Sequence, residues 1–139
     1  MSGNREAAWT PSKAWGQNYL VNKGVIEKIV DAAGNPPGHV VEIGPGRGAL
    51  TQELLERGFR VTGIELHRET AVALRERFAG EENFTLLEAD ASEIDYAPLL
   101  GGPKDVVLGN LPYCVAARIL YQLFRTGQGF SRWVLMFQR

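Results

Sequence analysis

Cysteine is almost absent from this sequence: Cys114 is the only one in 139 residues, so no disulfide can form within the chain. No apolar run approaches the ~20 residues that a membrane-spanning helix needs, and the N-terminus, MSGNREAAWTPSKAW, has no apolar core of signal-peptide length. An excess of one charge is also missing, because 15 basic and 16 acidic side chains are scattered without a block that could hold a polyanion. These absences predict a soluble, cytoplasmic protein and give no support to nucleic-acid binding by bulk charge.

The apolar content of 45% is enough for one compact domain with a buried core. Short apolar runs predict strands, and helical patterns lie between them. Asn22 can cap the first helix and Gly34 can end it. The predicted strands are residues 39–43, 60–65, 84–90, 105–110 and 132–138. This alternation predicts an α/β fold with a mostly parallel sheet and right-handed helical crossovers.

Polar side chains stand at the ends of four successive predicted strands: Glu42, Glu65, Asp90 and Asn110. The carboxyl ends of parallel strands meet at one edge of a sheet. Ligands of such folds bind outside that edge, where the strand order reverses. We therefore expect these four side chains to form one site.

The segment EIGPGRG places Gly44, Gly46 and Gly48 between a strand and a helix, where the backbone must turn tightly and leave room for a ligand. Taken alone the pattern is weak, because glycines can serve the turn only. The alternating glycines differ from the G-x-G-x-x-G spacing of dinucleotide-binding proteins. The pattern therefore favours a cofactor without a pyrophosphate.

Glu65 and Asp90 have the chemistry of an adenosine site. Glu65 lies where Rossmann-type folds present a carboxylate to the two hydroxyls of a ribose. Asp90 could accept a hydrogen bond from the exocyclic amine of adenine. The alternatives are a solvent-facing strand end for Glu65 and a capped turn for Asp90.

The stretch GNLPY, residues 109–113, suits methylation of an exocyclic adenine amine. That nitrogen is a poor nucleophile because its lone pair is delocalised into the ring. The side-chain oxygen of Asn110 and the backbone carbonyl of Leu111 could each accept one N–H and favour the charge that develops on nitrogen. Pro112 would hold Leu111 extended, and Tyr113 offers a face for base stacking. The alternative is an ordinary turn with a core tyrosine.

Three other features of the sequence are weaker indications of a functional site. The block WGQNYL, residues 15–20, could fold over the methionine end of a cofactor, although its aromatics could equally serve packing. Cys114 adjoins the motif without an identifiable base, so a small, semi-buried thiol is favoured over a nucleophile. His39 and His67 show no metal-ligand spacing, and we expect both to be structural or exposed and no metal to be bound.

Together, WGQNYL, VEIGPGRGALT, IELHRE, EADA and GNLPY resemble the small-subunit rRNA adenine N6,N6-dimethyltransferases, the KsgA-like family, from about Lys13 to Arg139. The resemblance implies a Rossmann-like class I S-adenosylmethionine-dependent methyltransferase that modifies N6 of adenines in 16S-type rRNA during ribosome biogenesis. It implies catalytic roles for Asn110, Leu111, Pro112 and Tyr113. The implied cofactor contacts are Gln17, Asn18, Leu20, Glu42, Gly44, Gly46, Glu65, Asp90 and Asn110.

Two departures from this family bear on the target-base pocket and on the length of the chain. After Tyr113 the family tends to have a Ser/Thr-Pro pair, which Cys114 to Arg118 lack. Members also continue past the fifth strand with two more strands, a second base-stacking aromatic and a small helical domain. We therefore expect a fragment truncated after the fifth strand, with a cofactor-covering leader at 1–21 and an incomplete methyltransferase domain at 22–139.

Three functions remain open from the sequence. The leading one is methylation of rRNA in the small ribosomal subunit or its precursor, by an enzyme that is monomeric at full length; the fragment could be inactive alone, and its edge strand invites self-association. The second is a large-subunit rRNA adenine methyltransferase of the antibiotic-resistance type. The third is a non-catalytic, cofactor-binding assembly or transcription factor of the same fold.

Overall fold

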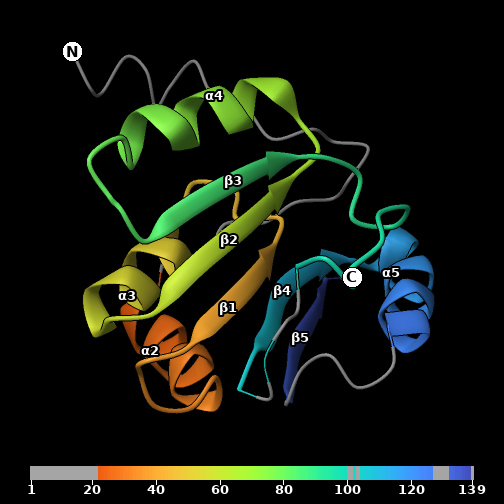
Figure 1. Cartoon of the computed structure of the whole chain (residues 1–139), viewed down its shortest axis with the longest axis horizontal. Helices are drawn as coiled ribbons and strands as arrows, with labels where there is room; N and C mark the ends of the chain where they lie inside the picture. Colours follow the sequence, from red (N-terminus) through yellow and green to blue (C-terminus); the bar gives the residue numbers. More distant parts are fainter. Residues whose placement is uncertain (1–21, 100–101, 103, 127–131, 139) are drawn as a thin grey trace.

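A single parallel sheet forms the centre of the molecule in a computed structural model that describes residues 22–99, 102, 104–126 and 132–138 (Figure 1). Its strand order is β3-β2-β1-β4-β5. The strands are β1 (His39–Ile43), β2 (Arg60–Glu65), β3 (Phe84–Glu88), β4 (Val106–Pro112) and β5 (Arg132–Gln138). The helices are α2 (Lys23–Ala32), α3 (Ala49–Arg57), α4 (Arg68–Arg77) and α5 (Tyr113–Thr126). The predicted α/β fold with a parallel sheet is therefore confirmed.

Most element ends fall where the sequence places them. Asn22 caps α2 by accepting a hydrogen bond from the backbone N–H of Val25 at 3.1 Å, and Gly34 follows this helix with a φ of 99°. Gly58, with a φ of 101°, ends α3. Left-handed backbone of this kind favours glycine because it has no Cβ.

Two strands have different ends from those predicted. β4 continues past Asn110 to Pro112, because β5 pairs with it as far as Pro112 and Gln138. β3 stops at Glu88, where its partner β2 also ends at Glu65. The predicted strand at 105–110 thus ends too early, and the alternative of an ordinary turn at residues 109–113 is wrong. The first four of these residues are strand, and Tyr113 begins α5.

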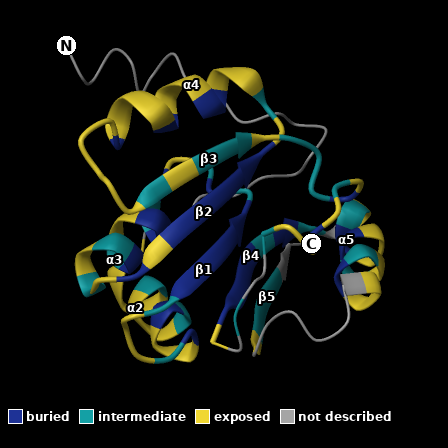
Figure 2. Cartoon of the chain, viewed as in Figure 1, coloured by how far each residue is buried: buried dark blue, intermediate teal, exposed yellow. Residues whose placement is uncertain are grey.

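Apolar side chains pack on both faces of the sheet. The central strands of the sheet are buried (Figure 2). On one face, α2 and α3 pack side chains such as Val30 and Leu54 against β1, β2 and β4. On the other face, α5 packs Ile119 and Leu123 against Val107 of β4 and its neighbours. Because successive residues of a strand point to opposite faces, the same strands supply both cores.

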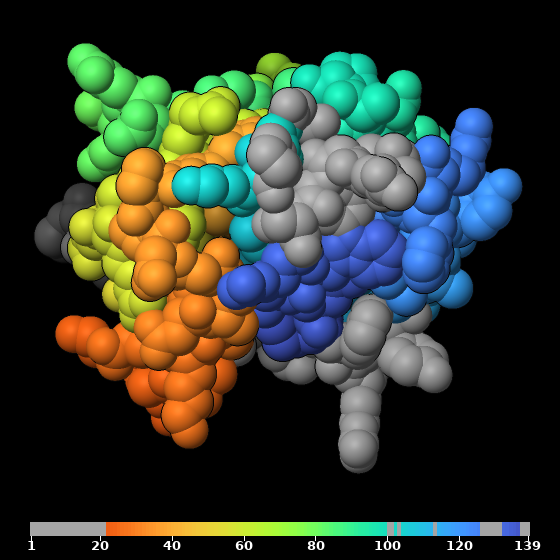
Figure 3. Space-filling view, turned by 60° about the horizontal axis from the view of Figure 1, so that its bottom comes forward, coloured from red at the N-terminus to blue at the C-terminus, as the bar shows by residue number. Residues whose placement is uncertain are grey.

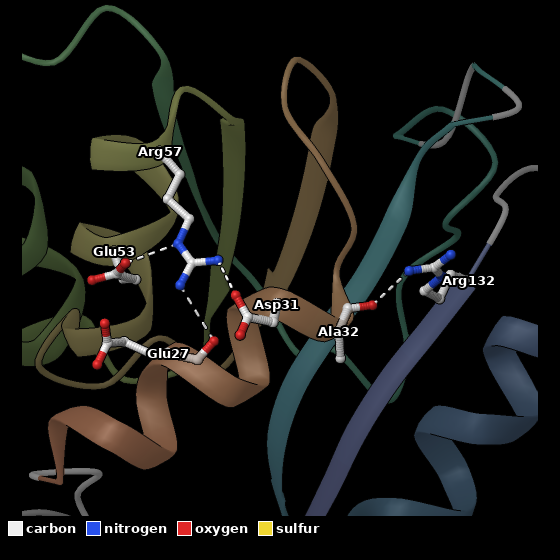
Figure 4. Close-up of polar contacts among 6 residues, drawn as sticks. All are labelled: Glu27, Asp31, Ala32, Glu53, Arg57 and Arg132. Carbon is white, nitrogen blue, oxygen red and sulfur yellow. Dashed lines mark hydrogen bonds and ion pairs between the residues drawn. The ribbon is translucent and has the colours of Figure 1, made fainter.

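Arginine side chains fasten α2 to its neighbours (Figure 4). From α3, Arg57 donates to Asp31 at 2.5 Å, to Glu53 at 2.9 Å and to the backbone carbonyl of Glu27 at 3.3 Å. From β5, Arg132 donates to the backbone carbonyl of Ala32 at 2.8 Å. The last turn of α2 is therefore held from two elements.

β5 is an edge strand and reaches the surface between α2 and α5 (Figure 3). Its side chains from Trp133 to Met136 are partly buried. In the part of the chain that the structure describes, no helix combines the length and the apolar character needed to cross a membrane.

Candidate functional site

The strand order reverses between β1 and β4, which are neighbours although β2 and β3 lie between them in sequence. The last pair of residues that joins these strands is Ile43 and Gly109. Asn110 to Pro112 therefore extend past β1 and pair with β5 only. This is the position where ligands bind in open parallel sheets.

The glycine-rich loop begins directly after β1, and Gly44, Gly46 and Gly48 all have positive φ angles of 66°, 60° and 90°. A Cβ added to Gly48 would lie 2.7 Å from Cε2 of Phe78, so this glycine permits close packing of α3 and α4. A Cβ added to Gly44 would meet nothing within 4 Å. The loop thus makes the predicted tight turn and also leaves space beside Gly44.

A small pocket with a cavity volume of about 40 Å³ opens beside this loop. Its walls come from the ends of β1, β2 and β4, the segment after β3, and the buried side of α5. The lining residues are Ile43, Gly44, Ile64, Glu65, Leu66, His67, Ala89, Asp90, Ala91, Pro112, Val115 and Ile119. The structure therefore brings four predicted site residues together: Gly44, Glu65, Asp90 and Pro112.

Glu65 supplies a carboxylate to the pocket wall and is only 1% exposed. Its Oε2 accepts a hydrogen bond from the backbone N–H of His67 at 3.0 Å. Its Oε1 is buried and, among the described residues, has no hydrogen-bond partner. Burial raises the pKa of Glu65, against the lowering effect of the backbone N–H groups of His67, Gly46 and Leu66. A buried acceptor of this kind costs free energy until a donor reaches it.

Asp90 lies two residues beyond β3 and shapes a turn. Its Oδ1 accepts hydrogen bonds from the backbone N–H of Ser92 at 2.9 Å and from the Ser92 hydroxyl at 2.6 Å. The turn interpretation of Asp90 is confirmed. The same residue lines the pocket, so the turn role and a ligand contact are compatible.

Glu42 is 1% exposed and does not line the pocket. Its Oε1 accepts a hydrogen bond from the Thr51 hydroxyl of α3 at 2.5 Å. Burial raises the pKa of Glu42 to about 7, with a smaller raising effect from Glu65 and a lowering effect from the Thr51 hydrogen bond. Glu42 thus links β1, which precedes the glycine-rich loop, to α3, which follows the loop.

The residues of the GNLPY motif separate into different environments. Asn110 is partly exposed, and the side chain of Leu111 is fully buried in the core beneath α5. Pro112 lines the pocket. The backbone of Tyr113 starts α5, but its side chain lies outside what the structure describes, as do the predicted contacts Gln17, Asn18 and Leu20 and the whole leader at 1–21.

The two histidines and Cys114 complete the candidate residues. His39 is buried at the start of β1, with Nε2 at 2.8 Å from the Thr62 hydroxyl, and His67 is partly buried beside Glu65. Cys114 is exposed, so the prediction of a semi-buried thiol is wrong: it lies on the outer side of α5. In the described ranges, no group of three or more His, Cys, Asp or Glu could hold a metal ion.

Sequence reasoning missed Thr51, Val115 and Ile119. Val115 and Ile119 stand four residues apart, the spacing of one helix face, directly after the motif, and that signal could have placed them in the pocket wall. The sequence carries no comparable signal for Thr51.

Comparison with known proteins identifies the family. The profile described as Ribosomal RNA adenine dimethylase matches residues 10–139. The chain belongs to the ribosomal RNA adenine dimethylase family. It is 46% identical over 126 residues to a ribosomal RNA small subunit methyltransferase A of Acidobacterium capsulatum, covering 89% of this chain and 44% of that protein. For the protein of the same name from Moorella thermoacetica the identity is 42% over 144 residues, covering 96% of this chain and 50% of that protein.

Solved structures place this member of the rRNA adenine dimethylase family in the same fold. A dimethyladenosine transferase from Plasmodium falciparum matches with a TM-score of 0.73 and 30% identity, over 88% of this chain and 44% of that chain. The 23S rRNA methyltransferase ErmE matches with a TM-score of 0.70 and 30% identity, over 80% of this chain and 44% of that chain. The fold is therefore the Rossmann-like fold of class I methyltransferases. The chain spans about half the length of the curated relatives it matches.

Proposed function

We propose that this chain binds S-adenosylmethionine and forms the catalytic part of an enzyme that methylates N6 of adenines in small-subunit rRNA. The observation that carries the proposal is Glu65, which lines the pocket beside the glycine-rich loop and whose buried Oε1 has no hydrogen-bond partner within the described residues. The two hydroxyls of a ribose are donors that suit both oxygens of this carboxylate.

The rest of the pocket also fits this cofactor. The open space beside Gly44 allows a ligand to approach the backbone closely. Apolar residues, among them Leu66, Val115 and Ile119, line the pocket and suit a flat purine ring. Asp90 stands at the same wall, where its carboxylate can accept a hydrogen bond from the exocyclic amine of the ring.

The end of β4 would hold the target adenine. S-adenosylmethionine supplies an electrophilic methyl group when it is bound. The side-chain oxygen of Asn110 and the carbonyl of Leu111 would each accept one N–H of the target amine, and so favour tetrahedral geometry and the positive charge that develops on N6. Both residues lie past the last β1 pair, on the open side of β4. Tyr113 would stack on the base.

Neither Asn110 nor Leu111 is a base at neutral pH. The proton that leaves N6 after methyl transfer would therefore pass to water. Catalysis would rest on orientation of the amine and on electrostatic stabilisation.

The small-subunit substrate is favoured by the curated relatives, which carry that name at 42–46% identity. A large-subunit substrate is the second candidate, because the structure named as a 23S rRNA methyltransferase matches with a TM-score of 0.70. We further propose a cytoplasmic enzyme that acts on the small ribosomal subunit or its precursor. Full-length members would be monomers, and the exposed edge of β5 could allow self-association of this shorter chain.

Calorimetry with S-adenosylmethionine tests the cofactor proposal. The folded chain should bind it, and Glu65→Ala should bind it roughly 10- to 100-fold more weakly, the range for a lost hydrogen bond to a charged group. Glu69→Ala, on the exposed first turn of α4, is the control and should bind like the wild type. Equal binding by wild type and Glu65→Ala would contradict the proposal.

The substrate proposal needs the longest natural protein that contains this chain. Unmethylated small and large ribosomal subunits are each incubated with labelled S-adenosylmethionine, and the modified nucleoside is identified. N6,N6-dimethyladenine in small-subunit rRNA is the expected product. Label in large-subunit rRNA alone would favour the second candidate, and no label in either would favour a non-catalytic factor.

A further inference from the structure

The turn that follows β3 is held by side chains that do not themselves line the pocket. Ala89, Asp90 and Ala91 form one wall of the pocket, and the chain then turns at Ser92. Ser92 is buried and donates twice to Oδ1 of Asp90. Because both donors reach the same oxygen, the orientation of the Asp90 carboxylate is fixed.

Tyr96 fixes the next residue of this wall. Its side chain is fully buried in the core beneath α5, and its hydroxyl donates to the backbone carbonyl of Ala91 at 2.7 Å. Burial raises the pKa of Tyr96, so the hydroxyl remains a donor at neutral pH. A fully buried side chain is a rigid anchor for a backbone carbonyl that has to stay in one place.

A third tether comes from α5. Gln122 donates from Nε2 to the backbone carbonyl of Ser92 at 3.2 Å. Arg118 also approaches the turn, with an ion pair to Glu93 at 3.5 Å, but both of these side chains are about two-thirds exposed. An exposed pair of this kind contributes little. The half-buried amide of Gln122 is therefore the contact through which α5 holds the turn.

We infer that Tyr96 and Gln122 are positioning residues that hold the 90–92 turn so that Asp90 selects a 6-amino purine over a 6-oxo purine in the cofactor. The inference rests on the proposed function and adds the origin of base selectivity to it. A carboxylate attracts an N–H donor at this position and repels a carbonyl oxygen. That discrimination is lost if the carboxylate swings away, whereas the contacts of Glu65 with the ribose are unaffected.

The test compares two ligands on the same chain by calorimetry: S-adenosylhomocysteine, and S-inosylhomocysteine, in which a carbonyl replaces the amine. The wild type should prefer the adenosyl ligand. Tyr96→Phe and Gln122→Met should each reduce that preference by about five-fold, the effect of one lost hydrogen bond, mainly through weaker adenosyl binding. Gln122→Met is the safer variant, because Gln122 is only partly buried.

Two controls lie on α5 itself. Tyr121→Phe removes the same hydroxyl from a tyrosine that is 64% exposed, and Arg118→Gln removes the exposed ion pair. Both should keep the wild-type preference. Preference unchanged in Tyr96→Phe and Gln122→Met, or both ligands weakened equally in these variants, would overturn the inference and leave the proposed function standing.

The wild type itself distinguishes failure of the inference from failure of the proposed function. A wild type that binds both ligands equally would remove the selectivity role of Asp90, and the inference with it, while the cofactor proposal remains. A folded wild type that binds neither ligand would overturn the proposed function together with the inference.

Discussion

The Thr51 hydroxyl in α3 donates to Oε1 of Glu42 in β1, across 2.5 Å and out of contact with water. This hydrogen bond joins the two elements on either side of the glycine-rich loop. The Glu42 carboxyl is fully buried and its pKa is about 7, so near neutral pH it is divided between the protonated and ionised forms. The anchoring of the loop therefore depends on pH.

The stability of the fold should change with pH through Glu42. Its folded-state pKa of about 7 lies above its ordinary value of 4.5, so its stabilising contribution is complete below pH 4.5 and is lost as the pH rises through 7. The loss should be on the order of 3 kcal/mol. Urea unfolding of the wild type and Glu42→Gln between pH 4 and 8 measures it, because glutamine keeps an acceptor for Thr51 and cannot ionise.

The difference between these two curves is the relevant quantity. Burial lowers the pKa of His39, so this residue makes both proteins less stable as the pH falls. This effect is opposite to that of Glu42. Subtraction removes the contribution of His39. A difference that is flat between pH 4.5 and 7 would contradict the raised pKa of Glu42.

Gly48→Ala should destabilise the fold. The residue has a φ of 90°, and the new Cβ would lie 2.7 Å from the Phe78 ring. Left-handed strain and overpacking together should cost about 2 to 4 kcal/mol in the free energy of unfolding. Gly80→Ala is the matched control, because its Cβ meets nothing within 4 Å and its φ is not positive. Equal unfolding midpoints for the two variants would refute the close packing at Gly48.

Gly44→Ala should act on ligand binding rather than on packing. Its φ of 66° costs about 1–2 kcal/mol of strain, but its Cβ would project into open space beside the pocket. We expect a loss of S-adenosylmethionine affinity that exceeds the loss of stability. Gly58→Ala carries similar strain at a φ of 101° away from the pocket and should leave affinity unchanged. Calorimetry and urea unfolding of both variants decide the point.

Asn110→Ala should lose methyl transfer far more than it loses folding. One of two acceptors for the target amine is removed, and the expected loss in kcat is on the order of 100-fold. Label transfer to unmethylated small subunits measures it in the longest natural protein that contains the chain. Asn83→Ala, at an exposed position before β3, is the control. Wild-type turnover in Asn110→Ala would remove the acceptor role.

Much of the fold follows from local patterns in the sequence. The strands at 39–43, 60–65 and 132–138 have the predicted bounds, because buried parallel strands are short apolar runs whose ends are set by turn residues. The end of β4 could not be predicted in this way. Pro112 belongs to the strand because β5, which follows 14 residues of helix, pairs with it.

The candidate site likewise combines features that the sequence predicts with features that only the tertiary structure sets. The sequence alone determined which chemical groups arrive at the carboxyl edge of the sheet: the three glycines, Glu65, Asp90 and the Asn110 motif, each at or close to the end of an apolar strand. Tertiary structure decided what those groups can do. Only the packing of α3 and α5 on the sheet buries Glu42 against Thr51 and brings Gln122 to the turn at Ser92. Each contact joins two residues that no local sequence pattern pairs with each other.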